Sequence, residues 1–192
     1  GLSPYRLVLV GIGLGAMATA LTSYLLTRAR VQDAQRAAVW LAGSLNGRTW
    51  DQLRPLALAL AVLVPATLLL AGSLRTLQLG DDTAAGLGVG VQRSRLAALV
   101  LAVALAAVAT ATAGPIAFVA FLAAPIARRL TGRPLTLVPA ALVGTVVVLV
   151  ADLAARRLFA PTELPAGVLT AVIGAPYLLW LLARAGRGGR AG

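Results

Sequence analysis

Three residue types that build many chemical sites are missing from this chain. Its 192 residues include no cysteine and no histidine. This excludes disulfides, metal sites built from thiols or imidazoles, and catalytic triads that rely on either side chain. Lysine is absent as well, because all 17 basic residues are arginine. The sequence therefore predicts no metal site and no bound cofactor.

Charged residues are scarce and hydrophobic residues abundant. Charged residues make up 12% of the chain and hydrophobic residues 59%, whereas about 25% of an ordinary soluble domain is charged. The mean hydropathy of +0.89 indicates an integral membrane protein. The formal charge of +11 does not indicate a nucleic-acid partner, since the arginines lie between apolar runs rather than along one stripe. Membrane topology and contact with lipid headgroups explain them better.

Long apolar runs set the fold class. A helix of about 20 residues crosses a bilayer, and continuous rather than alternating hydrophobicity favours helices. We expect an all-α, polytopic membrane helix bundle in which residues 1–192 form a single domain. No basic segment precedes the first run, so no signal peptide is expected, and the initial glycine is typical of a truncated start. The predicted crossings are 7–27, 56–74, 96–113, about 116–130, 135–151 and 164–183.

A polar segment, 77–95, separates two of these runs. It contains Asp81 and Asp82 directly after Gly80. We predict that one of the two acids caps a short helix beginning at Thr83, where it would also complement the positive end of the helix dipole. An ordinary turn with capping acids is the simpler interpretation of the same residues.

The second half of segment 77–95 is apolar and rich in glycine. Leu87 and Val89 would form an apolar knob on the loop. The glycines at 86, 88 and 90 would allow the turn to pack closely. These features favour a docking element for a soluble partner.

The distribution of arginine gives the expected orientation. If segment 77–95 is cytoplasmic, ten arginines lie on that side of the membrane and seven on the other, which favours this orientation. Seven is still more than topology requires, and indicates an outer partner with acidic contact points. The ten are Arg6, Arg75, Arg93, Arg95, Arg128, Arg129, Arg133, Arg184, Arg187 and Arg190, and the seven are Arg28, Arg30, Arg36, Arg48, Arg54, Arg156 and Arg157.

Four stretches, in this order, resemble the FecCD family, the permease subunits of type II ABC importers. They are WLAGSLNGRTW at 40–50, LQLGDDTAAGLGVGVQRSR at 77–95, GPIAFVAFLAAPIARRLTGRP at 114–134 and ADLAARRLFAPTELPAGVLTAVIGAPYLLWLLARAG at 151–186. Family members have about ten membrane helices, so this chain looks like their C-terminal six. The third stretch departs from the family, which commonly reads proline-histidine where this chain has Ala124 and Pro125.

The resemblance implies a location in the bacterial inner membrane and several partners. Segment 77–95 would hold the family's pair of short cytoplasmic coupling helices, which contact a separate ATP-binding subunit. Arg156 and Arg157 would dock glutamates of an extracytoplasmic substrate-binding protein. A second permease subunit would complete a homodimer or pseudo-homodimer. The coupling residues are Gly80, Asp81, Asp82, Thr83, Ala84, Leu87, Gly88 and Val89.

The function that this resemblance implies is import driven by ATP, with a ferric siderophore as the first choice of substrate and haem or cobalamin as alternatives. The chain itself would not be an enzyme, because it lacks the GxxxxGK[ST] phosphate-binding loop. A secondary transporter would need intramembrane acids or an ion site, and a purely structural membrane protein would need only packing faces. Asp152 stands four residues before Arg156 and is predicted to pair with it rather than to relay protons. The alternative role for Arg156 and Arg157 is that each side chain only contacts lipid headgroups.

Overall fold

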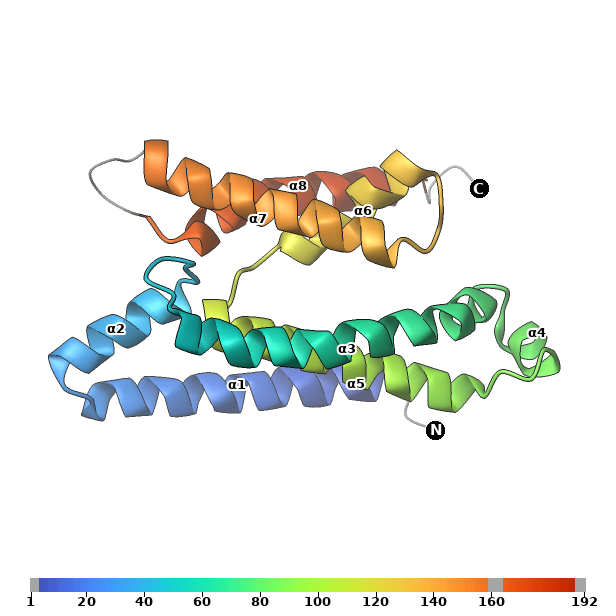
Figure 1. Ribbon diagram of the computed structural model, residues 1–192, viewed down its shortest axis with the longest axis horizontal. Helices are drawn as coiled ribbons and strands as arrows, with labels where there is room; N and C mark the ends of the chain where they lie inside the picture. Colours follow the sequence, from blue (N-terminus) through green and yellow to red (C-terminus); the bar gives the residue numbers. More distant parts are fainter. Residues whose placement is uncertain (1–3, 159–163, 189–192) are drawn as a thin grey trace. The chain divides into compact units, whose positions relative to one another are not determined.

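The computed structural model describes residues 4–158 and 164–188, and every regular element in these ranges is a helix (Figure 1). The long helices coincide with the predicted crossings, and two short helices lie between them. The elements are α1 (Pro4–Arg28), α2 (Val31–Leu41), α3 (Trp50–Leu77), α4 (Asp81–Gly86), α5 (Val91–Ala113), α6 (Val119–Thr131), α7 (Leu137–Leu158) and α8 (Ala166–Gly188).

Four helices are long and apolar enough to cross a membrane. They are Val8–Arg28 within α1, and the whole of α3, α5 and α7. The last predicted crossing, 164–183, corresponds to α8, whose described apolar part is Ala166–Trp180. The fourth, at about 116–130, corresponds to α6, which has 13 residues and is about 20 Å long at 1.5 Å per residue. Such a helix does not span about 30 Å of hydrocarbon by itself.

The chain divides into two compact units at residue 41. The first unit contains α1 and α2, joined by a tight turn in which the amides of Asp33 and Ala34 both donate to the carbonyl of Arg30, at 2.9 Å each. Helix α2 carries Asp33 in its first turn, where a carboxylate complements the helix dipole.

The second unit contains α3 to α8 in two groups. Helices α3 and α5 pack together with α4 at one end, and α6, α7 and α8 form the other group (Figure 1). Consecutive long helices run antiparallel (Figure 1). The connections and helix ends at one end of this unit therefore carry Arg75, Arg93, Arg95, Arg128, Arg129 and Arg133. Arg48, Arg54, Arg156 and Arg157 fall at the other end. This is the division that the sequence predicted for these ten arginines.

Small residues make the core of the second unit. Ala123 and Ala127 on α6, with Ala151 and Ala155 on α7, are buried. A methyl group added at Gly144 of α7 would meet Ala123 Cβ and a Val119 methyl at 3.6 Å. Small side chains let helix backbones approach closely, which is the usual basis of helix association in lipid. Among the larger apolar side chains, Leu122 is buried with them, whereas many others are exposed.

Three glycines allow close contacts between segments in the part of the second unit that is remote from α4. The amide of Gly167 donates to the carbonyl of Gly43 at 2.9 Å, and the amide of Ser44 donates to the carbonyl of Ala113 at 2.9 Å. Gly174 of α8 packs against Phe118, the residue before α6, which has a left-handed backbone (φ 65°). We call Gly43, Gly167 and Gly174 the glycine junction. It joins loop 42–49, the break between α5 and α6, and the first turns of α8.

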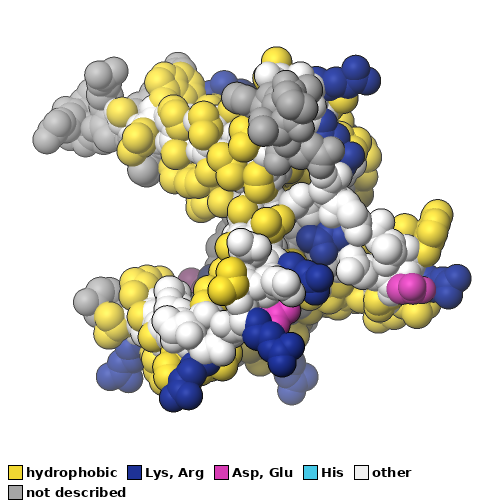
Figure 2. Space-filling model, turned by 90° about the vertical axis from the view of Figure 1, so that its left-hand side faces the viewer, with side chains coloured by type: hydrophobic (Ala, Val, Ile, Leu, Met, Phe, Trp, Pro, Cys, Tyr) yellow, Lys and Arg dark blue, Asp and Glu magenta, His cyan; other side chains and the backbone are white. Residues whose placement is uncertain are grey.

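The surface is predominantly apolar. Figure 2 shows hydrophobic side chains over much of the visible face, with arginines in separate groups rather than in one continuous patch. Exposed large residues include Leu58, Val62 and Leu69 on α3, and Val103 on α5. Such a surface suits contact with lipid.

Candidate functional site

Helix α4 forms the centre of the predicted coupling segment and begins two residues earlier than expected. Asp81 and Asp82 lie in its first turn, and Gly80 occupies the cap position with no side-chain cap hydrogen bond. The prediction that Asp81 or Asp82 caps the helix is therefore wrong. The backbone of Gly80 has φ 100° and ψ 156°, a region open essentially to glycine alone, so a glycine sets the start of the helix. The two acids still lie at its positive end.

The other end of α4 is closed by backbone hydrogen bonds. The amide of Gly88 donates to the carbonyl of Ala85 at 3.0 Å, and that of Val89 to Ala84 at 2.9 Å. Together with the left-handed φ of 81° at Gly88, these bonds make a Schellman motif. The sequence predicted that the glycines allow this turn to pack closely against neighbouring atoms, and the structure does not show such packing at Gly86 or Gly88. A Cβ at Gly86 or Gly88 would meet no atom within 4 Å.

The segment between α3 and α5 contains one short helix among the described residues rather than the pair that the family resemblance implied. After Val89 the chain passes through Gly90 directly into α5 at Val91. Ala84 is fully buried against the neighbouring helices, whereas Thr83 is exposed and Leu87 is 65% exposed. Val89 is partly covered. Only Leu87 therefore presents the apolar knob in full.

An ion pair ties α4 to α5. Arg95 Nη2 lies 2.8 Å from Asp81 Oδ1, with both side chains at least half exposed. Exposed pairs of this kind contribute about 1 kcal/mol or less, so the bond orients the short helix more than it stabilises the fold. Sequence reasoning missed Arg95 as the partner, because the two residues are 14 positions apart and no helical spacing links them. In the part of the chain that the structure describes, Asp82 forms no ion pair.

The two predicted docking arginines occupy the last turn of α7. Arg156 Nε donates to Asp152 Oδ2 at 2.9 Å, which confirms the predicted pair one helical turn apart. Asp152 is 19% exposed and Arg156 43% exposed. Arg157 is exposed and, over residues 4–158 and 164–188, takes part in no ion pair. Of the neighbouring sequence PTELP, residues 161–163 lie outside the described part.

The two candidate sites lie at opposite ends of the second unit. Helix α3 ends next to α4, and Arg75 near this end lines the same pocket as Leu137 at the start of α7. Arg156 and Arg157 are at the far end of α7, whose 22 residues make a helix about 33 Å long at 1.5 Å per residue. That length matches the hydrocarbon thickness of a bilayer. The geometry suits two partners that bind on opposite faces of a membrane.

Comparison with known proteins gives one consistent family. The sequence pattern described as the FecCD transport family matches residues 1–184. The ferric enterobactin transport system permease protein of Escherichia coli is 46% identical over 188 residues, which are 97% of this chain and 57% of that protein. The Fe(3+)-citrate import system permease protein of Bacillus subtilis is 44% identical over 183 residues, 94% of this chain and 55% of that protein. The chain therefore spans a little over half the length of these relatives.

A solved structure supports the same assignment. It is assigned to the metal-chelate type of ABC transporter, in an inward-facing conformation, and superposes on 95% of this chain with a TM-score of 0.81 and 30% sequence identity. The match covers 61% of the solved chain. The architecture is thus that of an ABC transporter permease, and the apolar helices are those of a multi-pass membrane protein. With its four quoted stretches, its helices and these relatives in agreement, the chain belongs to the FecCD transport family.

Proposed function

We propose that this chain is part of the permease subunit of an ATP-driven ABC importer in the bacterial inner membrane, and that it carries ferric siderophores by alternating access. The observation that supports this most directly is the similarity to permeases of ferric enterobactin and Fe(3+)-citrate systems across at least 94% of the chain. ATP hydrolysis would come from a separate cytoplasmic subunit. A second permease subunit would complete the path.

Helix α4 is the proposed contact for the ATP-binding subunit. Its ends are fixed by Gly80 and by the Schellman motif at Gly88, so that a short rigid helix projects between α3 and α5. The exposed Leu87 and the acidic first turn give it an apolar and a charged contact. A rigid element joined to two long helices could transmit movement of the ATPase to both, which alternating access requires.

Arg157 is the proposed principal contact for a substrate-binding protein. At this end of the second unit, Arg48 donates to the carbonyl of Ser44 at 2.9 and 3.2 Å, and Arg156 is held by Asp152. Among the described residues, no carboxylate pairs with Arg157 in the last turn of α7, so its guanidinium is the one we assign to a partner carboxylate. Such a charge-assisted pair gives both steering and register.

A reconstituted transport assay tests the proposed function. The full-length protein, its cognate ATPase and binding protein would be placed in proteoliposomes, and uptake of a radiolabelled ferric siderophore would be measured. We expect uptake that requires both ATP and the binding protein. Uptake driven by an ion gradient without ATP would instead indicate a secondary transporter, and absence of uptake with every component present would favour a structural role.

Neutralising the docking arginines one at a time should separate their roles. We expect Arg157→Gln to weaken binding of the substrate-binding protein about tenfold at low salt, the effect of losing one charge-assisted contact. Arg156→Gln should have a smaller effect, because Asp152 already occupies its guanidinium. Surface plasmon resonance at two salt concentrations measures both, with Arg128→Gln at the opposite end as the charge-matched control. Equal affinity for wild type and Arg157→Gln would show that Arg157 only contacts headgroups.

A further inference from the structure

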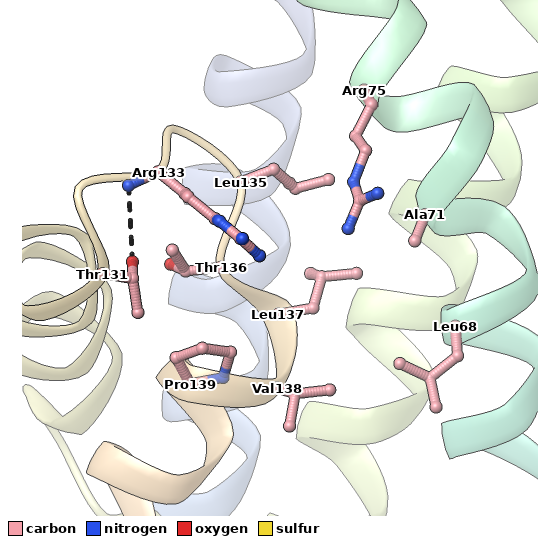
Figure 3. Close-up of a pocket in the computed structure, with 10 residues that line it drawn as sticks. All are labelled: Leu68, Ala71, Arg75, Thr131, Arg133, Leu135, Thr136, Leu137, Val138 and Pro139. Carbon is pink, nitrogen blue, oxygen red and sulfur yellow. Dashed lines mark hydrogen bonds between the residues drawn. The ribbon is translucent and has the colours of Figure 1, made fainter.

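A cavity of about 460 Å³ lies beside the end of α3 that leads to α4 (Figure 3). Its wall on α3 is made by Leu68, Ala71 and Arg75, and the opposite wall comes from the end of α6, the following loop and the start of α7. Arg75 and Arg133 extend from these two walls toward one another, so their guanidinium groups converge on the same space.

The charge in this cavity is uncompensated. None of its lining residues is acidic, and in the described ranges neither Arg75 nor Arg133 takes part in an ion pair. Both arginines are exposed to solvent, and two like charges that face one space favour an anion between them. Arginine binds phosphate oxygens with two parallel hydrogen bonds. The cavity thus has the charge and the donors for a phosphate group.

The polar part of the cavity includes a helix start. Helix α7 begins at Leu137, and Thr136, Leu137, Val138 and Pro139 all line the space, although Pro139 has no amide hydrogen to donate. The first amides of a helix have no partner within it and carry a partial positive charge. The Thr131 hydroxyl donates to the carbonyl of Ala127 at 2.8 Å and lies 3.4 Å from the amide of Arg133, which positions the loop that carries this arginine. The helix start adds a partial positive charge to that of the two arginines.

The remainder of the cavity is apolar and continues onto the outer surface. Leu68 and Val138 are 45% and 51% exposed, and both belong to helices with the length and composition of membrane spans. A free inorganic phosphate would leave these side chains uncovered, whereas a lipid would place its headgroup between the arginines and its acyl chains along α3 and α7. Basic pockets between membrane helices are known to suit anionic headgroups.

We infer that this cavity binds the phosphodiester headgroup of an anionic phospholipid, held between Arg75 and Arg133. The headgroup bridges the two helix groups of the second unit at the end where α4 projects. The bound lipid would therefore brace α3 against the α6–α7 loop. This site is separate from both the coupling helix and the docking arginines.

Lipid titration of the purified full-length protein in neutral detergent tests this inference. Phosphatidylglycerol and phosphatidylcholine of equal chain length would be added separately, and bound lipid would be measured by native mass spectrometry. We expect phosphatidylglycerol to bind at least tenfold more tightly than phosphatidylcholine. The Arg75→Gln/Arg133→Gln variant should lose at least tenfold in affinity for phosphatidylglycerol, since each surface arginine contributes about fivefold.

A charge-matched control makes the result specific to the cavity. The Arg30→Gln/Arg54→Gln variant loses the same two charges outside the cavity, and its affinity should change less than twofold. Equal loss in both double variants would overturn the inference, as would equal binding of the two lipids by wild type. Inorganic phosphate that displaces phosphatidylglycerol at equal concentration would also overturn it and indicate a free-anion site. If the double variant does not fold, each single variant should lose about fivefold.

Discussion

Replacing Gly167 with alanine should destabilise the protein by about 3 kcal/mol or more, at the upper end of the cost of overpacking. A Cβ at this position would fall well inside van der Waals contact with the Ala42 carbonyl oxygen, and would lie 3.1 Å from the Gly43 carbonyl oxygen. Both are backbone atoms, which cannot move aside as the end of a side chain can. The hydrogen bond from the Gly167 amide to Gly43 would be disturbed as well.

Gly43→Ala should have an effect of similar size through a different cause. Its backbone has φ +74°, and an added Cβ would lie 2.5 Å from the Pro115 carbonyl oxygen. The substitution thus combines a strained backbone with a clash. Because natural domains are stable by only about 5–15 kcal/mol, either change should sharply reduce the yield of folded protein.

Thermal unfolding in detergent, followed by fluorescence-detected size-exclusion chromatography, measures both effects. Gly72→Ala is the matched control, because a Cβ at Gly72 within α3 meets no atom within 4 Å and alanine favours a helix over glycine. The control should unfold at the wild-type temperature or slightly above. A wild-type unfolding temperature for Gly167→Ala would mean that α8 and loop 42–49 are not in contact as described.

The glycine junction also marks the limit of what the sequence could predict. The junction contacts join residues far apart in the chain, and no local pattern links Gly43 to Gly167. Phe118 has a positive φ, which is uncommon for a residue other than glycine and rarer still for a bulky one. The break at Gly114 was predictable, because an uncharged run too long for one span contains a glycine and a proline there. The contacts that the break makes depend on tertiary packing.

The long helices were predictable for a different reason. In lipid every backbone polar group must be bonded within the segment, so the length of an apolar run almost determines a helix by itself. The length of the apolar runs correctly predicted α3, α5 and α7. Helix α3 continues through Pro65. It does not show which side chains converge in space. For this reason Arg75 and Arg133 appeared in the sequence only as two members of a topological count.

Helix α4 lies between these two cases. A short helix with acids at its start follows from residue preferences, and the structure has one. Which residue caps it depends on where the backbone first leaves helical geometry. Gly80, with its positive φ, moved that point two residues upstream of the predicted start. The preference of aspartate for cap positions was therefore overridden by a backbone conformation that only glycine adopts readily.

Reversing both acids of α4 should prevent the ATP-binding subunit from co-purifying with the full-length protein. In the Asp81→Arg/Asp82→Arg variant, two cations would replace two anions at the positive end of α4, a change that costs about 0.3–1 kcal/mol per residue in the helix itself. Arg95, now 2.8 Å from Asp81, would face a like charge. We expect the amount of bound ATPase to fall at least tenfold while insertion into the membrane is unchanged, since no apolar span is altered.

Two further variants separate contact with the ATPase from support of α4. Arg95→Gln removes the exposed ion pair but leaves both acids available, and it should retain the ATPase nearly as well as wild type because such pairs stabilise little. Asp81→Asn/Asp82→Asn removes the charges without reversing them and should give an intermediate loss. If the doubly reversed variant still binds the ATPase normally, the acids of α4 do not form the contact, and the exposed Leu79 and Leu87 would remain as candidates on this loop. Retention of the ATPase by Arg95→Gln together with its loss from the doubly reversed variant would place the acidic first turn at the interface.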